Sequence, residues 1–217
     1  MKKRPYNQIK FTTSGKKTAV LEHLVGDMSV TTNGGGYILP VPCGAGKSTG
    51  VVSLVGLYPD EGFVIFVKTQ LECRDMYDRL RQAGVAVDEI MMIYSPTEED
   101  KKFAESINPF TRTLDPAKIK AAEATKRAKT AYATMMERPA ELTTKRVLII
   151  TSQHLYTNFL PALFAYTTKK TPLDLYQYIG KTKELLRSTD ARKFIIIDEQ
   201  PDFFQTSATF NGRLATS

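Results

Sequence analysis

The sequence has few cysteines and no long apolar run, and both absences limit what the protein can be. Its 217 residues include only Cys43 and Cys73, too few for the disulfide framework of a small secreted domain. No apolar segment follows the basic residues 1–4, so we expect no secretory signal, and no stretch is long enough to span a bilayer. These features predict a reduced, cytoplasmic protein, or one associated with nucleic acid inside the cell.

Acidic residues are outnumbered by basic ones. The chain has 30 Lys and Arg against 23 Asp and Glu, a net charge of +7. A basic protein suits a polyanionic partner such as nucleic acid, although many basic proteins bind none. The 42% hydrophobic and 24% charged residues are typical of an ordinary globular protein. We therefore expect residues 1–217 to form a single sizeable domain.

A glycine-rich stretch at residues 41–49 carries the strongest functional signal. It reads Val-Pro-Cys-Gly-Ala-Gly-Lys-Ser-Thr and lies between an apolar run and a helical pattern, the order of a phosphate-binding loop. Gly44 and Gly46 let successive N–H groups turn toward phosphate oxygens, and the following helix adds its positive N-terminal end. The Lys47 ammonium can reach the β- and γ-phosphates, and the Ser48 hydroxyl can bind Mg²⁺. We therefore predict that ATP and Mg²⁺ bind at Gly44, Ala45, Gly46, Lys47, Ser48 and Thr49.

Two carboxylates supply the second half of this predicted site. Asp198 and Glu199 directly follow the apolar residues 194–197, so a buried strand is expected to end at them. Open α/β folds bind ligands at the carboxyl edge of the sheet, where the phosphate-binding loop also lies. Asp198 is expected to hold Mg²⁺, usually through water, and Glu199 to polarise the water that attacks ATP. An acidic strand end that simply faces solvent is the alternative interpretation.

Apolar, β-branched runs predict the strands of the fold. They cover residues 37–41, 63–67, 90–94, 146–150 and 194–197, and helical patterns separate most of them. Continuous apolar runs are typical of strands buried on both faces of a parallel sheet. The predicted fold class is therefore α/β, a P-loop NTPase with a mostly parallel central sheet flanked by helices.

Residues 96–145 interrupt this alternation of strands and helices. Within them, residues 117–138 have strong helix propensity but few large apolar side chains. This composition predicts an inserted, exposed helix outside the core. Its basic residues line a nucleic-acid backbone or form a solvated face; they are Lys118, Lys120, Lys126, Arg127, Lys129 and Arg138. A further helix is predicted to start at Pro172 and to run through Ile179.

With the loop and the acidic pair described, the chain resembles the first RecA-like domain of superfamily 2 helicases and translocases, the DExD/H group. The loop variant Val-Pro-x-Gly-x-Gly-Lys-Ser is similar to the first motif of that family, where a residue other than glycine, here Val41, often opens the loop. The resemblance implies an ATP hydrolase that depends on nucleic acid, with Lys47 and Glu199 as catalytic residues. A later tripeptide is similar to the family motif that links nucleotide state to nucleic-acid grip: Ser207, Ala208 and Thr209.

The resemblance also implies contacts with nucleic acid and adenine. Thr69 and Gln70, at the end of one predicted strand, and Thr151 and Ser152, at the end of another, are similar to family motifs that touch the nucleic-acid backbone. Ordinary caps at strand ends are the alternative for these four residues. Near the start of the chain, Gln8 resembles the glutamine with which the family reads adenine.

The chain departs from the family in two respects. Gln200 and Pro201 follow the acidic pair, where the DEAD and DEAH subgroups have other residues. The family also completes its ATP site with arginines from a second RecA-like domain, which this chain lacks. Because losing such an arginine lowers turnover by about three to five orders of magnitude, the resemblance implies weak hydrolysis by the chain alone and a place within a larger motor.

Two other functions stay open. One is a viral DNA-packaging, terminase-like ATPase domain, which shares much of this signature. The other is a non-catalytic, ATP-responsive module that acts through a protein partner. A small-molecule kinase is disfavoured, because no arginine-rich lid is recognisable in the sequence.

Overall fold

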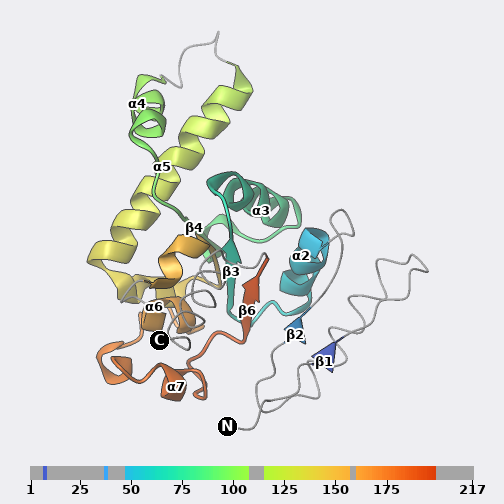
Figure 1. The fold of residues 1–217 in the computed structure, drawn as a ribbon, viewed down its shortest axis with the longest axis vertical. Helices are drawn as coiled ribbons and strands as arrows, with labels where there is room; N and C mark the ends of the chain where they lie inside the picture. The colour runs from blue at the N-terminus through green and yellow to red at the C-terminus, as the bar shows by residue number, and fades with distance from the viewer. Residues whose placement is uncertain (1–6, 9–36, 39–46, 108–114, 157–159, 199–217) are drawn as a thin grey trace, which may run out of the picture. The chain divides into compact units, whose positions relative to one another are not determined.

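The computed structural model describes residues 7–8, 37–38, 47–107, 115–156 and 160–198. These residues belong to two compact units, which divide between residues 59 and 60. In the first unit, β1 (Asn7–Gln8) and β2 (Tyr37–Ile38) pair in parallel, and α2 (Lys47–Leu57) follows (Figure 1). The predicted helix after the glycine-rich stretch is confirmed, and so is the start of the strand before it.

The second unit is built on a four-stranded parallel sheet. Its strands are β3 (Phe63–Val67), β4 (Ile90–Ile93), β5 (Val147–Thr151) and β6 (Phe194–Ile197), and their order in the sheet is β4-β5-β3-β6. All three pairings are parallel, with β3 in the centre between β5 and β6. The four strands predicted for this part of the chain are confirmed, as is the α/β class.

One face of this sheet packs against α5 (Pro116–Glu137), the 3-10 helix η2 (Pro139–Thr144) and α6 (Leu160–Phe164). Strand and helix side chains together form a continuous apolar core there. Its buried residues are Val64, Phe66, Ile93, Ala131, Met135, Leu142, Leu148, Ile150, Ala162 and Leu163.

The helix α3 (Gln70–Gln82) packs against β3, β4 and β5. Neighbouring side chains along a strand point to opposite faces, so the residues between those of the α5 face are available to α3. The side chains that α3 buries are Cys73, Met76, Tyr77 and Leu80. Every residue of β3 and β5 is buried, as expected for strands covered on both faces.

The prediction that residues 117–138 lie outside the core is wrong. This segment forms most of α5, and one stripe of the helix is buried: Ala122, Thr125, Ala128, Ala131, Thr134 and Met135. These residues recur every three or four positions, and most are small, so the helix backbone can lie close to the sheet and to α4 (Glu98–Ser106) without large apolar side chains. None of the described helices, α5 included, is both long and apolar enough to cross a membrane.

The predicted helix from Pro172 to Ile179 is also wrong. This segment holds only a short 3-10 turn, η4 (Tyr176–Tyr178), before the short helix α7 (Thr182–Leu185). The Asp174 carboxylate accepts a hydrogen bond from the Tyr176 N–H at 3.0 Å, a local turn that competes with helix formation. Tyr176 and Ile179 are 84% and 63% exposed, so no burial favours a helix either.

A buried arginine joins the elements at the amino edge of the sheet. The Arg192 side chain is 2% exposed and donates five hydrogen bonds to backbone carbonyls, with no carboxylate partner among the described residues. Its guanidinium also lies over the Tyr166 ring, 5.5 Å from the centroid. The five acceptors come from β3, α6, η2 and the two residues between η2 and β5: Phe63, Leu142, Lys145, Arg146 and Leu163.

Candidate functional site

The start of α2 carries the described part of the predicted phosphate-binding loop. Lys47 and Ser48 are its first two residues and are half-buried, while Thr49 is exposed. The first turn has no acidic residue, so no side chain of the helix itself offsets its positive N-terminal end. An accessible ammonium and an accessible hydroxyl at such a helix start suit an anionic ligand. Gly44, Ala45 and Gly46 lie outside the described residues.

The pairing of β1 with β2 brings Gln8 near the same stretch of sequence. Gln8 is in register with Ile38, on the strand that leads toward the glycine-rich residues. This register concerns the backbone only, so the adenine contact implied for Gln8 stays a prediction.

Asp198 lies at the carboxyl edge of the sheet in the second unit. It directly follows β6, and its N–H donates to the carbonyl of Phe66 at 3.0 Å, so the ladder between β6 and β3 extends to this residue. Asp198 is half-buried. Because the four strands are parallel, the ends of β3, β4 and β5 share this edge with Asp198. Glu199 lies outside the described residues.

Thr69 and Gln70, predicted to touch nucleic acid, have roles within the chain. Thr69 is the N-cap of α3: its hydroxyl accepts from the Glu72 N–H at 3.2 Å, and its own N–H donates to the Glu72 carboxylate at 2.8 Å. The Gln70 side-chain amide donates to the carbonyl of Ser95, after β4, at 2.9 Å. These bonds agree with the alternative of strand-end caps, although the Thr69 hydroxyl keeps a proton to donate.

Thr151 and Ser152 occupy the same edge at the end of β5. Thr151 is only 3% exposed, and its hydroxyl has no hydrogen-bond partner among the residues that the structure describes. Ser152 is half-buried and begins the 3-10 helix η3 (Ser152–Tyr156). A phosphate could therefore reach Ser152 directly, whereas contact with the Thr151 hydroxyl requires its surroundings to move.

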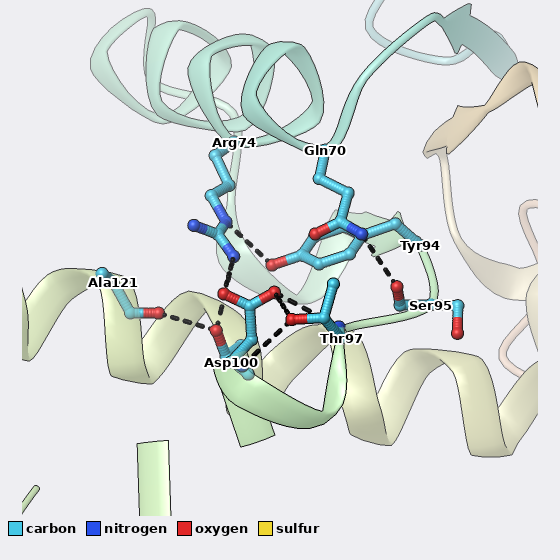
Figure 2. Close-up of polar contacts among 8 residues, drawn as sticks. Gln70, Arg74, Tyr94, Ser95, Thr97, Asp100 and Ala121 are labelled. Atoms are coloured by element: carbon cyan, nitrogen blue, oxygen red, sulfur yellow. Dashed lines mark hydrogen bonds and ion pairs between the residues drawn. The ribbon is translucent and has the colours of Figure 1, made fainter. Parts of the chain in front are cut away.

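The sequence analysis missed a polar cluster at this edge, around Arg74 (Figure 2). The Arg74 Nε donates to the Tyr94 hydroxyl at 2.9 Å, and its guanidinium lies 5.3 Å from the centre of that ring. Nη2 lies 3.4 Å from the Thr125 hydroxyl and 3.8 Å from the Asp100 carboxylate, so α3 is joined to α4 and α5. Burial raises the pKa of Tyr94, which therefore stays protonated at neutral pH. Arg74 follows Gln70 by one helical turn, which is the only sequence signal that could have drawn attention to it.

The basic residues of α5 are mostly engaged within the chain. Three of the six form ion pairs: Lys120 with Asp78 at 2.8 Å, Lys129 with Glu105 at 3.2 Å, and Arg138 with Glu141 at 2.7 Å. Arg127 donates to the Tyr77 hydroxyl at 2.6 Å. Only Lys118 and Lys126 have no polar partner within the described parts of the chain. A continuous basic surface for a nucleic-acid backbone is therefore not formed by this helix alone.

The predicted site residues divide between the two units. Lys47, Ser48 and Gln8 belong to the first, and Asp198 belongs to the second. No group of three or more His, Cys, Asp or Glu side chains in the described ranges could hold a metal ion. The implied coupling residues Ser207, Ala208 and Thr209 lie outside those ranges.

Comparisons with known proteins return no relative. No family model, no curated protein and no solved structure matches this chain at a significant level.

Proposed function

We propose that this chain binds ATP and Mg²⁺ and serves as the ATPase domain of a nucleic-acid-dependent motor of the superfamily 2 type. The observation that carries the proposal is the position of Asp198, anchored at the carboxyl edge of an all-parallel sheet directly after β6. Parallel α/β sheets bind ligands at this edge. A half-buried aspartate there suits a metal-bound water.

The start of α2 supports the phosphate half of the proposal. The Lys47 ammonium would contact the β- and γ-phosphates, the Ser48 hydroxyl would bind Mg²⁺ and Asp198 would hold the hydrated ion. When bound, the metal supplies positive charge that offsets the charge of the transferring phosphoryl group. Lys47 and Ser48 fit this role because they open a helix whose first turn carries no acidic side chain. Glu199 would then polarise the attacking water.

Equilibrium binding of a fluorescent ATP analogue, with and without Mg²⁺, tests the proposal. Lys47→Ala is expected to weaken binding at least about tenfold, because a charge-assisted contact to phosphate is worth about 1.5–3 kcal/mol. Asp198→Asn is expected to weaken binding in Mg²⁺ but not in EDTA, since its partner is the metal. Lys118→Ala removes an exposed lysine of α5 and is the matched control. Binding that is unchanged in Lys47→Ala, or absent in the wild-type chain, would refute the proposal.

A second candidate, a non-catalytic ATP-responsive module, is favoured by the engagement of the expected nucleic-acid contacts. Thr69 caps α3, Gln70 holds the Ser95 carbonyl, and Thr151 is buried. ATP hydrolysis with and without single-stranded DNA or RNA separates the two candidates, with Glu199→Gln as the inactive control. Stimulation by nucleic acid supports the motor, whereas ATP binding without any response to nucleic acid supports the module.

A further inference from the structure

A groove of about 350 Å³ lies at the β4 edge of the sheet. The helices α3 and α5 pass on either side of this strand (Figure 1). None of the residues proposed to bind ATP or Mg²⁺ contributes to it, although Lys126 and Arg127 belong to the basic residues of α5 considered above as a nucleic-acid surface. Residues from α3, η1 (Val87–Glu89), β4 and α5 line the groove, together with Lys145, which precedes β5. They are Tyr77, Val87, Ile90, Met91, Met92, Lys126, Arg127, Thr130, Ala131 and Lys145.

The floor of the groove is apolar. Ile90, Met92 and Ala131 are each less than a tenth exposed, and Met91 is half-buried. Val87 is 48% exposed at the rim, so an apolar group bound there would cover side-chain surface that water now reaches. The two methionines are flexible and polarizable, so they adapt to apolar groups of different shapes.

Three cations face this apolar floor, and no carboxylate lines it. Lys126, Arg127 and Lys145 form no ion pair with any described residue, unlike Lys120 and Lys129 of the same region. Two of the three are held in place by other bonds. The Arg127 guanidinium donates to the Tyr77 hydroxyl at 2.6 Å, and the Lys145 ammonium donates to the Asp88 carbonyl at 2.9 Å.

Acidic residues near the groove do not cancel this charge. Asp88 and Glu89 belong to η1, but neither side chain lines the groove. The Glu89 carboxylate is engaged elsewhere, 3.2 Å from Nη2 of Arg146. Three cations without an ion pair to any described carboxylate therefore remain beside an apolar surface, and an anion placed there would gain attraction without displacing one of those carboxylates.

We propose that this groove binds a small organic anion, in which one carboxylate, sulfonate or phosphate is attached to an apolar body. The apolar body would cover the β4 side chains and the anionic group would meet Lys126 and Lys145. The volume is at the lower end of the roughly 300–1,000 Å³ typical of small-molecule sites. The competing explanation is that the cations only protect the open edge of β4 from pairing with another strand.

A pair of matched dyes tests this proposal: 1-anilinonaphthalene-8-sulfonate, and N-phenyl-1-naphthylamine, which lacks the sulfonate. Fluorescence titrations use the full chain carrying Lys47→Ala, so that the predicted phosphate-binding loop does not contribute. This also separates the result from the fate of the proposed function. The sulfonated dye is expected to bind one site at least about tenfold more tightly than the neutral dye, the effect of about 1.4 kcal/mol of charge attraction.

Variants locate the site. Lys126→Gln with Lys145→Gln is expected to weaken binding of the sulfonated dye at least tenfold and to leave the neutral dye unchanged. Lys118→Gln with Lys170→Gln removes the same charge from exposed positions outside the groove and is expected to change neither. Thr130→Phe fills the groove and is expected to weaken both dyes. Circular dichroism confirms that each variant is folded.

Three results would overturn the proposal. The first is equal affinity for the two dyes, and the second is equal loss in the groove and control variants. The third is self-association of the Lys126→Gln and Lys145→Gln variant with unchanged dye binding, which would show that these cations protect the strand edge.

Discussion

Replacing Arg192 by methionine is expected to cause a large loss of stability, because the guanidinium is the shared donor for five carbonyls. Two of these carbonyls keep a backbone donor: that of Arg146 accepts from the Phe63 N–H at 2.8 Å, and that of Leu142 accepts from the Lys145 N–H at 3.1 Å. The Phe63 carbonyl lies in β3, where Phe63 is in parallel register with Val147 of β5, so the strand ladder also supplies it with a donor. The carbonyls of Lys145 and Leu163 therefore depend most on Arg192. A buried acceptor that loses its donor costs about 1–3 kcal/mol, so two of them set a range of about 2–6 kcal/mol.

The expected loss lies at the lower end of that range, at about 2–4 kcal/mol, because neighbouring backbone groups and water replace part of the lost bonding. Methionine fills most of the same space, so a cavity adds little. Burial lowers the pKa of the Arg192 guanidinium to about 9, which still leaves it protonated at neutral pH. The charge is therefore present throughout the measurement, and the carbonyl dipoles and the Tyr166 ring are what stabilise it.

Urea unfolding followed by circular dichroism at 222 nm and by tyrosine fluorescence measures this loss; the chain has no tryptophan. Agreement of the two probes checks for a single cooperative transition. Arg187→Met removes an exposed arginine from the same region and is the matched control, with an expected change under about 0.5 kcal/mol. If Arg192→Met unfolds within about 1 kcal/mol of the wild-type chain with the same dependence on urea, the five bonds contribute little and the reasoning fails.

Three further predictions concern buried groups of the second unit. A Cβ added at Gly62 would lie 2.5–2.7 Å from Tyr166 side-chain atoms, so Gly62→Ala should lower the free energy of unfolding by about 1–3 kcal/mol. If the same substitution causes a similar loss in a Tyr166→Ala protein, a clash with Tyr166 is not the cause. Cys73 is fully buried, and burial raises the pKa of its thiol. In a Cys43→Ser variant, where Cys73 is the remaining thiol, it should react with a thiol reagent only as the protein unfolds. Rapid reaction under native conditions would contradict this. Burial lowers the pKa of His154 in the folded protein below its ordinary value of 6.5. The stability that the neutral ring contributes is therefore complete above the pKa of the unfolded chain and is lost as the pH falls through the lower pKa of the folded protein. His154→Phe should lose less stability than the wild-type chain between pH 7.5 and 5.5, and an unchanged pH dependence would count against this cause.

Local patterns in the sequence were enough to predict the strands and the two anchor points of the candidate site. The apolar run at 63–67 coincides with β3, and all five of its residues are buried, as expected for a strand between two covering layers. The run at 194–197 coincides with β6, but the expectation that this strand is buried is wrong for Ile195 and Ile197, which are 41% and 45% exposed. A glycine-rich turn before a helical pattern placed Lys47 at a helix start, and the acidic pair after an apolar run placed Asp198 at a strand end. Each of these inferences uses only neighbours along the chain.

Tertiary packing alone decided the strand order, the burial of α5 and the partners of the buried polar groups. Arg74 bonds to Tyr94 and Thr125, which lie 20 and 51 residues away, and no local pattern specifies such partners. Alanine and threonine can face either water or a core, so their place in α5 depends on which strand and helix approach them. Arg192 is an ordinary basic residue in the sequence, and it becomes a buried donor only because the starts of three strands converge on it.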